Sequence, residues 1–176
     1  MKIIPLLLIS YMTISNSCTI QPEPSDFFLK LNYSQKEKSK DSNSQNTNLN
    51  IKNRIIEYSV THGGYDPRPN VTKEYKMTKE AENKLIEYIK KRKLNQNIKE
   101  SIDDVSPGIN VNLSLKIKIG DITSKSDISG AVNAWGSKEY LKKQNMKTIE
   151  NKAYYHEIHS LLVFMKTKLG YEEIEI

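Results

Sequence analysis

Residues 109–119 constrain the fold more than any other stretch, because apolar and polar side chains alternate along them without interruption. The apolar positions are Ile109, Val111, Leu113, Leu115, Ile117 and Ile119, with asparagine, serine and lysine between them. A period of two is typical of a strand with one buried and one solvated face. The stretch therefore predicts a long central strand of an antiparallel sheet.

Two shorter stretches, residues 51–62 and 71–77, alternate in the same way and predict a hairpin. The segment between them, residues 63–70, is rich in glycine and proline, as expected of a long loop. A further strand is predicted over residues 128–135, and residues 171–176 are expected to add a short edge strand.

Two stretches carry the period of a helix. Thr78 is a good N-cap for a helix over residues 79–94, whose apolar side chains fall on one face. A second helix is predicted from about residue 148 to residue 169, ending at Gly170, a natural C-terminal cap.

The order of these elements is ββαββα. It predicts an α+β fold in which an antiparallel sheet of about four or five strands carries both helices on one face. Residues 34–50 contain a single apolar residue and cannot bury enough surface to offset the entropy of ordering them. We therefore expect a flexible tether over residues 18–50 and one folded domain over residues 51–176.

The N-terminus has the pattern of a secretory signal peptide, expected over residues 1–17. Lys2 precedes an apolar run at residues 3–9, and small polar residues follow at 15–17. The run is too short to cross a membrane, which takes about 20 apolar residues.

Cys18 is the single cysteine of the chain and directly follows Ser17. In this respect residues 1 to about 20 resemble the N-terminus of bacterial lipoproteins, in which a signal is cut before a cysteine that is then acylated. Ser15 and Asn16 stand where that family usually has leucine and a small residue. The resemblance implies lipidation at Cys18, and Thr19 after it implies the outer membrane, facing the periplasm. The alternative is an ordinary cleaved signal with an incidental cysteine.

The chain has a net charge of +6, from 27 Lys and Arg against 21 Asp and Glu. The densest basic cluster, residues 90–93, ends a predicted helix whose first turn carries Glu80 and Glu82. That arrangement complements the helix dipole without any partner. We therefore expect a solvated face and no nucleic-acid partner, and the alternative is an acidic protein partner or an anionic lipid surface.

The sequence carries no nucleophile elbow and no phosphate-binding loop. His156 and His159 resemble half of a zinc motif, but their spacing is one residue short of it, and nothing in the sequence brings His62 near them. We expect no enzymatic activity, no metal and no cofactor. A zinc-dependent hydrolase using these three histidines is the enzymatic alternative.

The loop over residues 63–70 is the best candidate for a contact with a partner. Tyr65, Asp66 and Arg68 lie on a stiff tip, and tyrosine and arginine are favoured interface anchors. The alternative is a hairpin loop shaped only by its turn residues. Trp135, the single tryptophan, is the second candidate if it is exposed, and the alternative is that it packs under the tether.

These features favour a membrane-tethered lipoprotein that binds another envelope or secreted protein without catalysis. An inhibitor or immunity protein is one such class, and the loop weakly resembles the opening of some small bacterial protease-inhibitor domains. The non-enzymatic alternative is a structural or assembly lipoprotein of the envelope.

Overall fold

A computed structural model describes residues 25–37, 43–102, 109–132 and 146–175. In this part the chain forms a seven-stranded sheet and two helices, an α+β fold. The elements are β1 (Phe27–Glu37), β2 (Ser44–Lys52), β3 (Ile55–Gly63), β4 (Val71–Lys76), α1 (Lys79–Lys91), β5 (Ile98–Ile102), β6 (Ile109–Ile119), β7 (Ile122–Val132) and α3 (Met146–Leu169).

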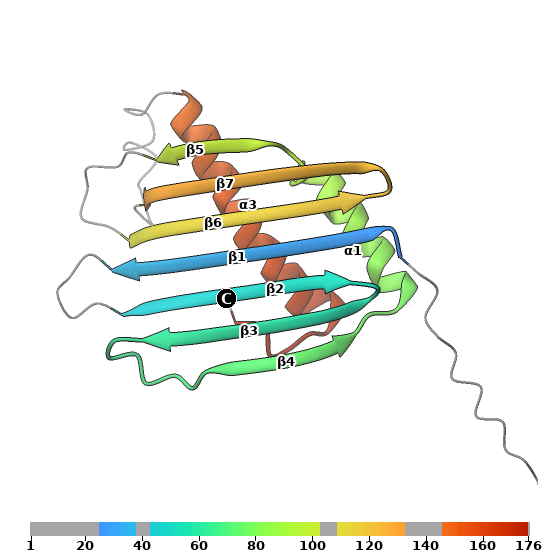
Figure 1. Ribbon diagram of the computed structural model, residues 1–176, viewed down its shortest axis with the longest axis horizontal. Coiled ribbons are helices and arrows are strands. Elements are labelled where there is room, and N and C mark those ends of the chain that lie inside the picture. The colour runs from blue at the N-terminus through green and yellow to red at the C-terminus, as the bar shows by residue number, and fades with distance from the viewer. Residues whose placement is uncertain (1–24, 38–42, 103–108, 133–145, 176) are drawn as a thin grey trace, which may run out of the picture.

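The strands lie side by side in the order β4-β3-β2-β1-β6-β7-β5 (Figure 1). Strands β1 to β4 form an antiparallel meander, and the β6–β7 hairpin pairs with the other side of β1. Strand β5 closes the far edge and is parallel to β7. The first strand of the chain is therefore the middle strand of the sheet.

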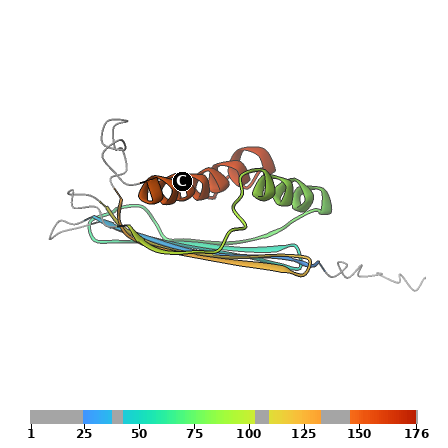
Figure 2. The same cartoon turned by 90° about the horizontal axis from the view of Figure 1, so that it is seen from above.

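Both helices lie on one side of the sheet (Figure 2). The core lies between the two layers and is built from alternate residues of the central strands, such as Leu31, Leu49 and Leu115, each at most 1% exposed. From α3 it receives Ile158, Leu161, Leu162 and Met165, the stripe expected from the sequence. The two helices contact each other where the rings of Tyr88 and Phe164 stack, with centroids 4.2 Å apart.

Several predicted elements are confirmed. Strand β6 has the predicted bounds, β3 pairs with β4 across the predicted loop, and Thr78 caps α1 by accepting a hydrogen bond from the amide of Ala81. Gly170, with φ of 79°, follows the end of α3. The α+β class is confirmed as well.

The number and order of strands were predicted wrongly, chiefly because of the expected tether. Residues of that stretch form β1 and β2, so the folded domain includes residues 27–37 and 44–50, which were expected to be flexible. Gln35 and Gln45 point toward the helix side, yet they are paired: the Gln35 amide donates to Gln45 at 3.0 Å, and Gln45 donates to Thr47 at 3.3 Å. Polar residues can line a sheet's inner face when they satisfy one another.

Three smaller differences have local causes. Strand β5 was missed because it is only five residues long and pairs with a strand that follows it in the chain. Strand β7 starts at Ile122 instead of residue 128, because Gly120, with φ of 58°, allows a two-residue turn after β6. Residues 171–175 form no strand, and Tyr171 and Ile174 pack into the core instead.

A buried ion pair holds the β2–β3 turn and the start of β1 to α1. Asn53 and Arg54 both have positive φ, 51° and 60°, as a two-residue hairpin turn requires. The Arg54 guanidinium lies 2.6 Å from the carboxylate of Glu82, which also accepts a hydrogen bond from the hydroxyl of Ser25. Glu82 is only 6% exposed, so these partners are what makes its burial tolerable.

Candidate binding face

The sheet has one covered face and one open face. Side chains alternate across each strand, so residues such as Leu113 and Leu115 face the helices while Asn112 and Ser114 face away from them. Within the described part of the chain, no helix or loop covers the second face (Figure 2). We call this surface the open face.

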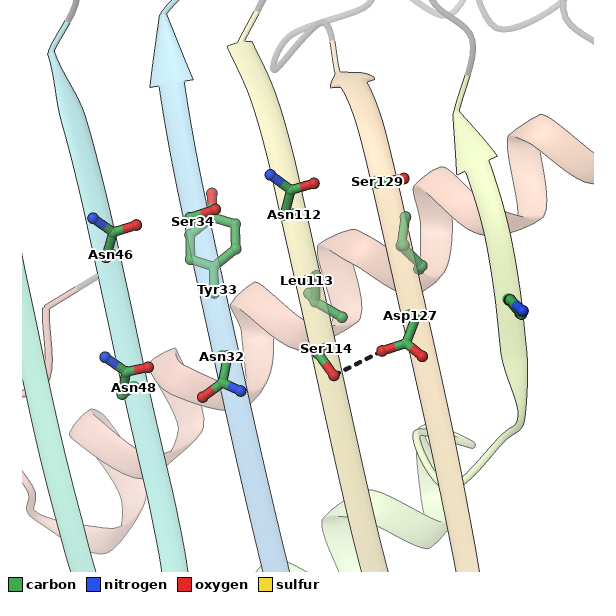
Figure 3. A pocket seen from close by; sticks show the side chains of 12 residues that line it. Asn32, Tyr33, Ser34, Asn46, Asn48, Asn112, Leu113, Ser114, Asp127 and Ser129 are labelled. Carbon is green, nitrogen blue, oxygen red and sulfur yellow. Dashed lines mark hydrogen bonds between the residues drawn. The ribbon is translucent and has the colours of Figure 1, made fainter.

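The register gathers short polar side chains at the centre of the open face. Asn32 of β1 lies opposite Asn48 of β2 on one side and Ser114 of β6 on the other, and Ser114 lies opposite Asp127 of β7. A second row of the same kind joins Asn46, Ser34, Asn112 and Ser129 (Figure 3). Asparagine and serine thus meet on four neighbouring strands.

These rows line a shallow hollow of about 600 Å³ between β2 and β5. A neighbouring hollow of about 740 Å³ extends over β3 and β4 and shares Asn32 and Asn48 with the first. Asparagine and serine are short, whereas Lys99 and Lys30 at the margins are long, so the centre of the face is recessed.

Much of the hydrogen-bonding capacity of the first hollow is unused by the residues that the structure describes. The Ser114 hydroxyl donates to Asp127 at 2.7 Å. By contrast, the amides of Asn32, Asn46 and Asn112 make no hydrogen bond to any other described side chain. Each such amide offers two N–H donors and one carbonyl acceptor, so a ligand lying on the hollow finds both kinds of group.

Asp127 supplies a fixed negative charge at the edge of the hollow. Lys125, 2.8 Å away, and the Ser114 hydroxyl both stabilise the carboxylate and hold its pKa below the usual value. The group is therefore ionised at neutral pH.

The structure brings three of the predicted contact residues together in the β3–β4 loop, but two of them bind each other. The Arg68 guanidinium lies 2.6 Å from the carboxylate of Asp66. It also reaches Glu175 at 3.4 Å and Gln45 at 3.3 Å. Only Tyr65, 77% exposed, projects freely.

Asp66 and Arg68 thus belong to a cluster that holds the C-terminal segment against the hairpin. His62, whose side chain is 1% exposed, lies between the carboxylates of Asp66 at 3.2 Å and Glu175 at 3.0 Å. The Glu175 amide also donates to the Tyr58 hydroxyl at 2.9 Å. The loop prediction remains untested, but these contacts supply a structural role for both charged residues.

The remaining predicted residues fall partly outside the described part of the chain. Cys18, Trp135 and the side chain of His156 lie outside it. His159 is exposed on α3, whereas His62 is enclosed by the cluster at the end of β3. No group of three His, Cys, Asp or Glu side chains among the described residues is placed to hold a metal ion.

The sequence itself carries a signal for the open face. Asn110, Asn112 and Ser114 form the wet side of a predicted strand, whereas asparagines 46, 48 and 50 fall in the predicted tether. Their period of two, opposite Thr47, Leu49 and Ile51, would have placed a second asparagine-rich strand in the sheet.

None of the described helices has an apolar stretch of the length needed to span a membrane. No protein-family model matches this chain, and no curated protein sequence matches it significantly.

Proposed function

We propose that this protein is a non-enzymatic binding module of the bacterial envelope, tethered through Cys18, whose open face receives a partner protein. The observation that carries the proposal is a hollow lined by asparagines, three of which make no hydrogen bond to another described side chain, at the centre of a sheet face that no described helix or loop covers. Solvation of a sheet face does not require a recessed centre, whereas binding of a complementary surface is favoured by one.

The open face has the dimensions of a protein interface. Strands about 4.8 Å apart make this sheet about 30 Å wide, and a rise of about 3.3 Å per residue gives lengths from about 35 Å at the centre to about 17 Å at the shorter edge strand, β5. The resulting area, about 1,000 Å², exceeds the roughly 800 Å² that each partner buries in a standard complex.

Its chemistry suits a polar, specific contact. Asparagine and serine are enriched in antibody paratopes because they offer adaptable hydrogen bonds. Asp127 and Lys99, on neighbouring strands at one side of the hollow, add charges of opposite sign. A partner that matched this pattern would be selected by hydrogen bonds and charge together.

An affinity measurement with matched variants tests the open face. The partner is captured from the envelope of cells that make the protein, identified, and titrated against wild type, Asn48→Arg and Asn83→Arg. Asn48 lies in both hollows, whereas Asn83 is exposed on α1, so the two substitutions add the same charge on opposite sides of the molecule. We expect Asn48→Arg to weaken binding at least tenfold, about 1.4 kcal/mol, and Asn83→Arg to bind like wild type.

A third variant separates the open face from the loop. If Tyr65→Ala abolishes binding while Asn48→Arg leaves it unchanged, the β3–β4 loop is the site and the open-face proposal is wrong.

The tether is tested separately by labelling cells with palmitate. Incorporation of label that is lost in Cys18→Ala supports a lipid anchor. Release of unlabelled wild-type protein from the cell envelope contradicts it.

A further inference from the structure

Lysines gather at one end of the open face, beyond the asparagine rows. Lys30 of β1 lies opposite Lys116 of β6, which lies opposite Lys125 of β7. In the next row outward, Phe28 of β1 lies between Lys52 of β2 and Lys118 of β6. We call the five lysines of these two rows the lysine patch.

Most of this charge is not neutralised by the protein. Lys125 pairs with Asp127, but Lys30, Lys52, Lys116 and Lys118 form no ion pair with any described carboxylate. Like charges directly opposite on adjacent strands are destabilising, so the sheet carries an unfavourable arrangement here. Exposed Glu57 and Glu74 lie in the row of Lys30, beyond Asn50, and exposed Asp26 and Asp121 lie at the same end, so carboxylates on this face offset part of the charge without pairing with these four lysines.

Phe28 gives the lysine patch an apolar centre. Its side chain is half-buried on the open face, and the ammonium of Lys116 lies 6.0 Å from its ring centroid. Helices that lie in a membrane interface combine lysines with aromatic side chains that enter the boundary between headgroups and acyl chains. The lysine patch offers the same two kinds of side chain on a sheet.

The lysine patch lies at the end of the sheet nearest to Cys18 along the chain. Strand β1 begins at Phe27, and its first outward-facing side chain is Phe28. Seven residue steps separate Cys18 from Ser25, and an extended chain of that length spans at most about 25 Å. A lipid on Cys18 would therefore hold the lysine patch within reach of the membrane surface.

From these observations we infer that the lysine patch, with Phe28 at its centre, docks on the anionic phospholipid headgroups of the membrane that anchors Cys18. The inference rests on the tether of the proposed function, because the anchor is what brings the patch to the surface. Docking at this end orients the domain, with the first asparagine row beginning two residues farther along β1, at Asn32.

Vesicle binding by residues 18–176 with Cys18→Ala tests the patch without the lipid and without the apolar signal. Binding is compared on vesicles of phosphatidylcholine alone and of phosphatidylcholine with phosphatidylglycerol, at about 0.1 M salt, where charge acts over about 10 Å. We expect preferential binding to the vesicles with phosphatidylglycerol. The preference falls when lysines 30, 116 and 118 are changed to glutamine.

The expected loss is large, because each basic residue near an anionic surface strengthens binding about fivefold, so three contribute on the order of 100-fold. The matched control changes Lys90, Lys91 and Lys168, all exposed on the helix side, to glutamine. It removes the same charge and should retain the preference. Equal loss in both variants, or a loss below threefold in the patch variant, overturns the inference.

A nucleic acid is the other polyanion that a lysine patch could bind. Tighter binding to a short DNA duplex than to the anionic vesicles, lost in the patch variant, would assign the patch to nucleic acid and overturn the membrane inference. If the protein does not bind the vesicles, the docking inference is wrong, but the lipid anchor at Cys18 is unaffected. Palmitate labelling tests that anchor independently.

Discussion

Leu31→Ala should strongly destabilise the domain, because Leu31 lies at the centre of the middle strand. Its side chain is fully buried, and its neighbours in register are Leu49 of β2 and Leu115 of β6, each 1% exposed. Truncating a buried leucine to alanine removes its transfer free energy and leaves a cavity, which together cost about 3 kcal/mol. For a chain of this size the melting temperature should fall by about 10 °C.

Thermal and urea unfolding, followed by circular dichroism in a Cys18→Ala background, measures this loss. Asn32→Ala is the matched control, since Asn32 is the next residue on the same strand but lies on the open face. It should change the free energy of unfolding by no more than about 0.5 kcal/mol. Were residues 27–37 a flexible tether, both variants would unfold like wild type, and that result would refute the seven-stranded sheet.

Two further predictions concern ion pairs. Glu82→Gln should lower the free energy of unfolding by about 3 kcal/mol, because it leaves the Arg54 guanidinium without its carboxylate in a largely buried site. The control is Glu80→Gln, which removes the exposed ion pair with Lys84 and should cost less than about 0.5 kcal/mol. Urea unfolding measures both losses. The hydrogen bond from Arg68 holds the pKa of Asp66 well below its usual value, so the stability that Asp66 adds is present at neutral pH and is lost as pH falls below about 4. The difference in unfolding free energy between wild type and Asp66→Asn should therefore narrow from pH 5 toward pH 2, and a constant difference would contradict this role.

The elements predicted correctly from the sequence are those whose hydrophobic periodicity and terminal capping residues lie within the element itself. The uninterrupted alternation of β6, the N-cap at Thr78 and the apolar stripe of α3 each lie within one element. Such signals do not depend on what the element packs against, so they could be read without knowing the sheet.

The elements that the sequence missed depend on contacts with distant residues. Gln45 is buried in β2 while Gln35 and Arg68, on other elements, donate hydrogen bonds to it, and Gln45 in turn donates to buried Thr47. Composition alone predicts a tether for such a stretch, because it contains no information about hydrogen-bond partners on other elements. The fold was therefore predicted in class but not in strand number or order.

The candidate site was missed for the same reason. The hollow exists only because β1 brings Asn32 between Asn48 and Ser114, which are 66 residues apart in the chain. The loop residues that sequence analysis favoured are local and easily recognised, yet Asp66 and Arg68 bind each other in the structure.

Photocrosslinking in the cells that make the protein tests most directly whether the open face is the binding surface. A photoreactive residue is placed at position 48 in one variant and at position 83 in another, on the open face and on α1. Binding through the open face predicts a discrete crosslinked product from position 48 and none from position 83. A product from position 83 alone would contradict it and place the partner on the helix side.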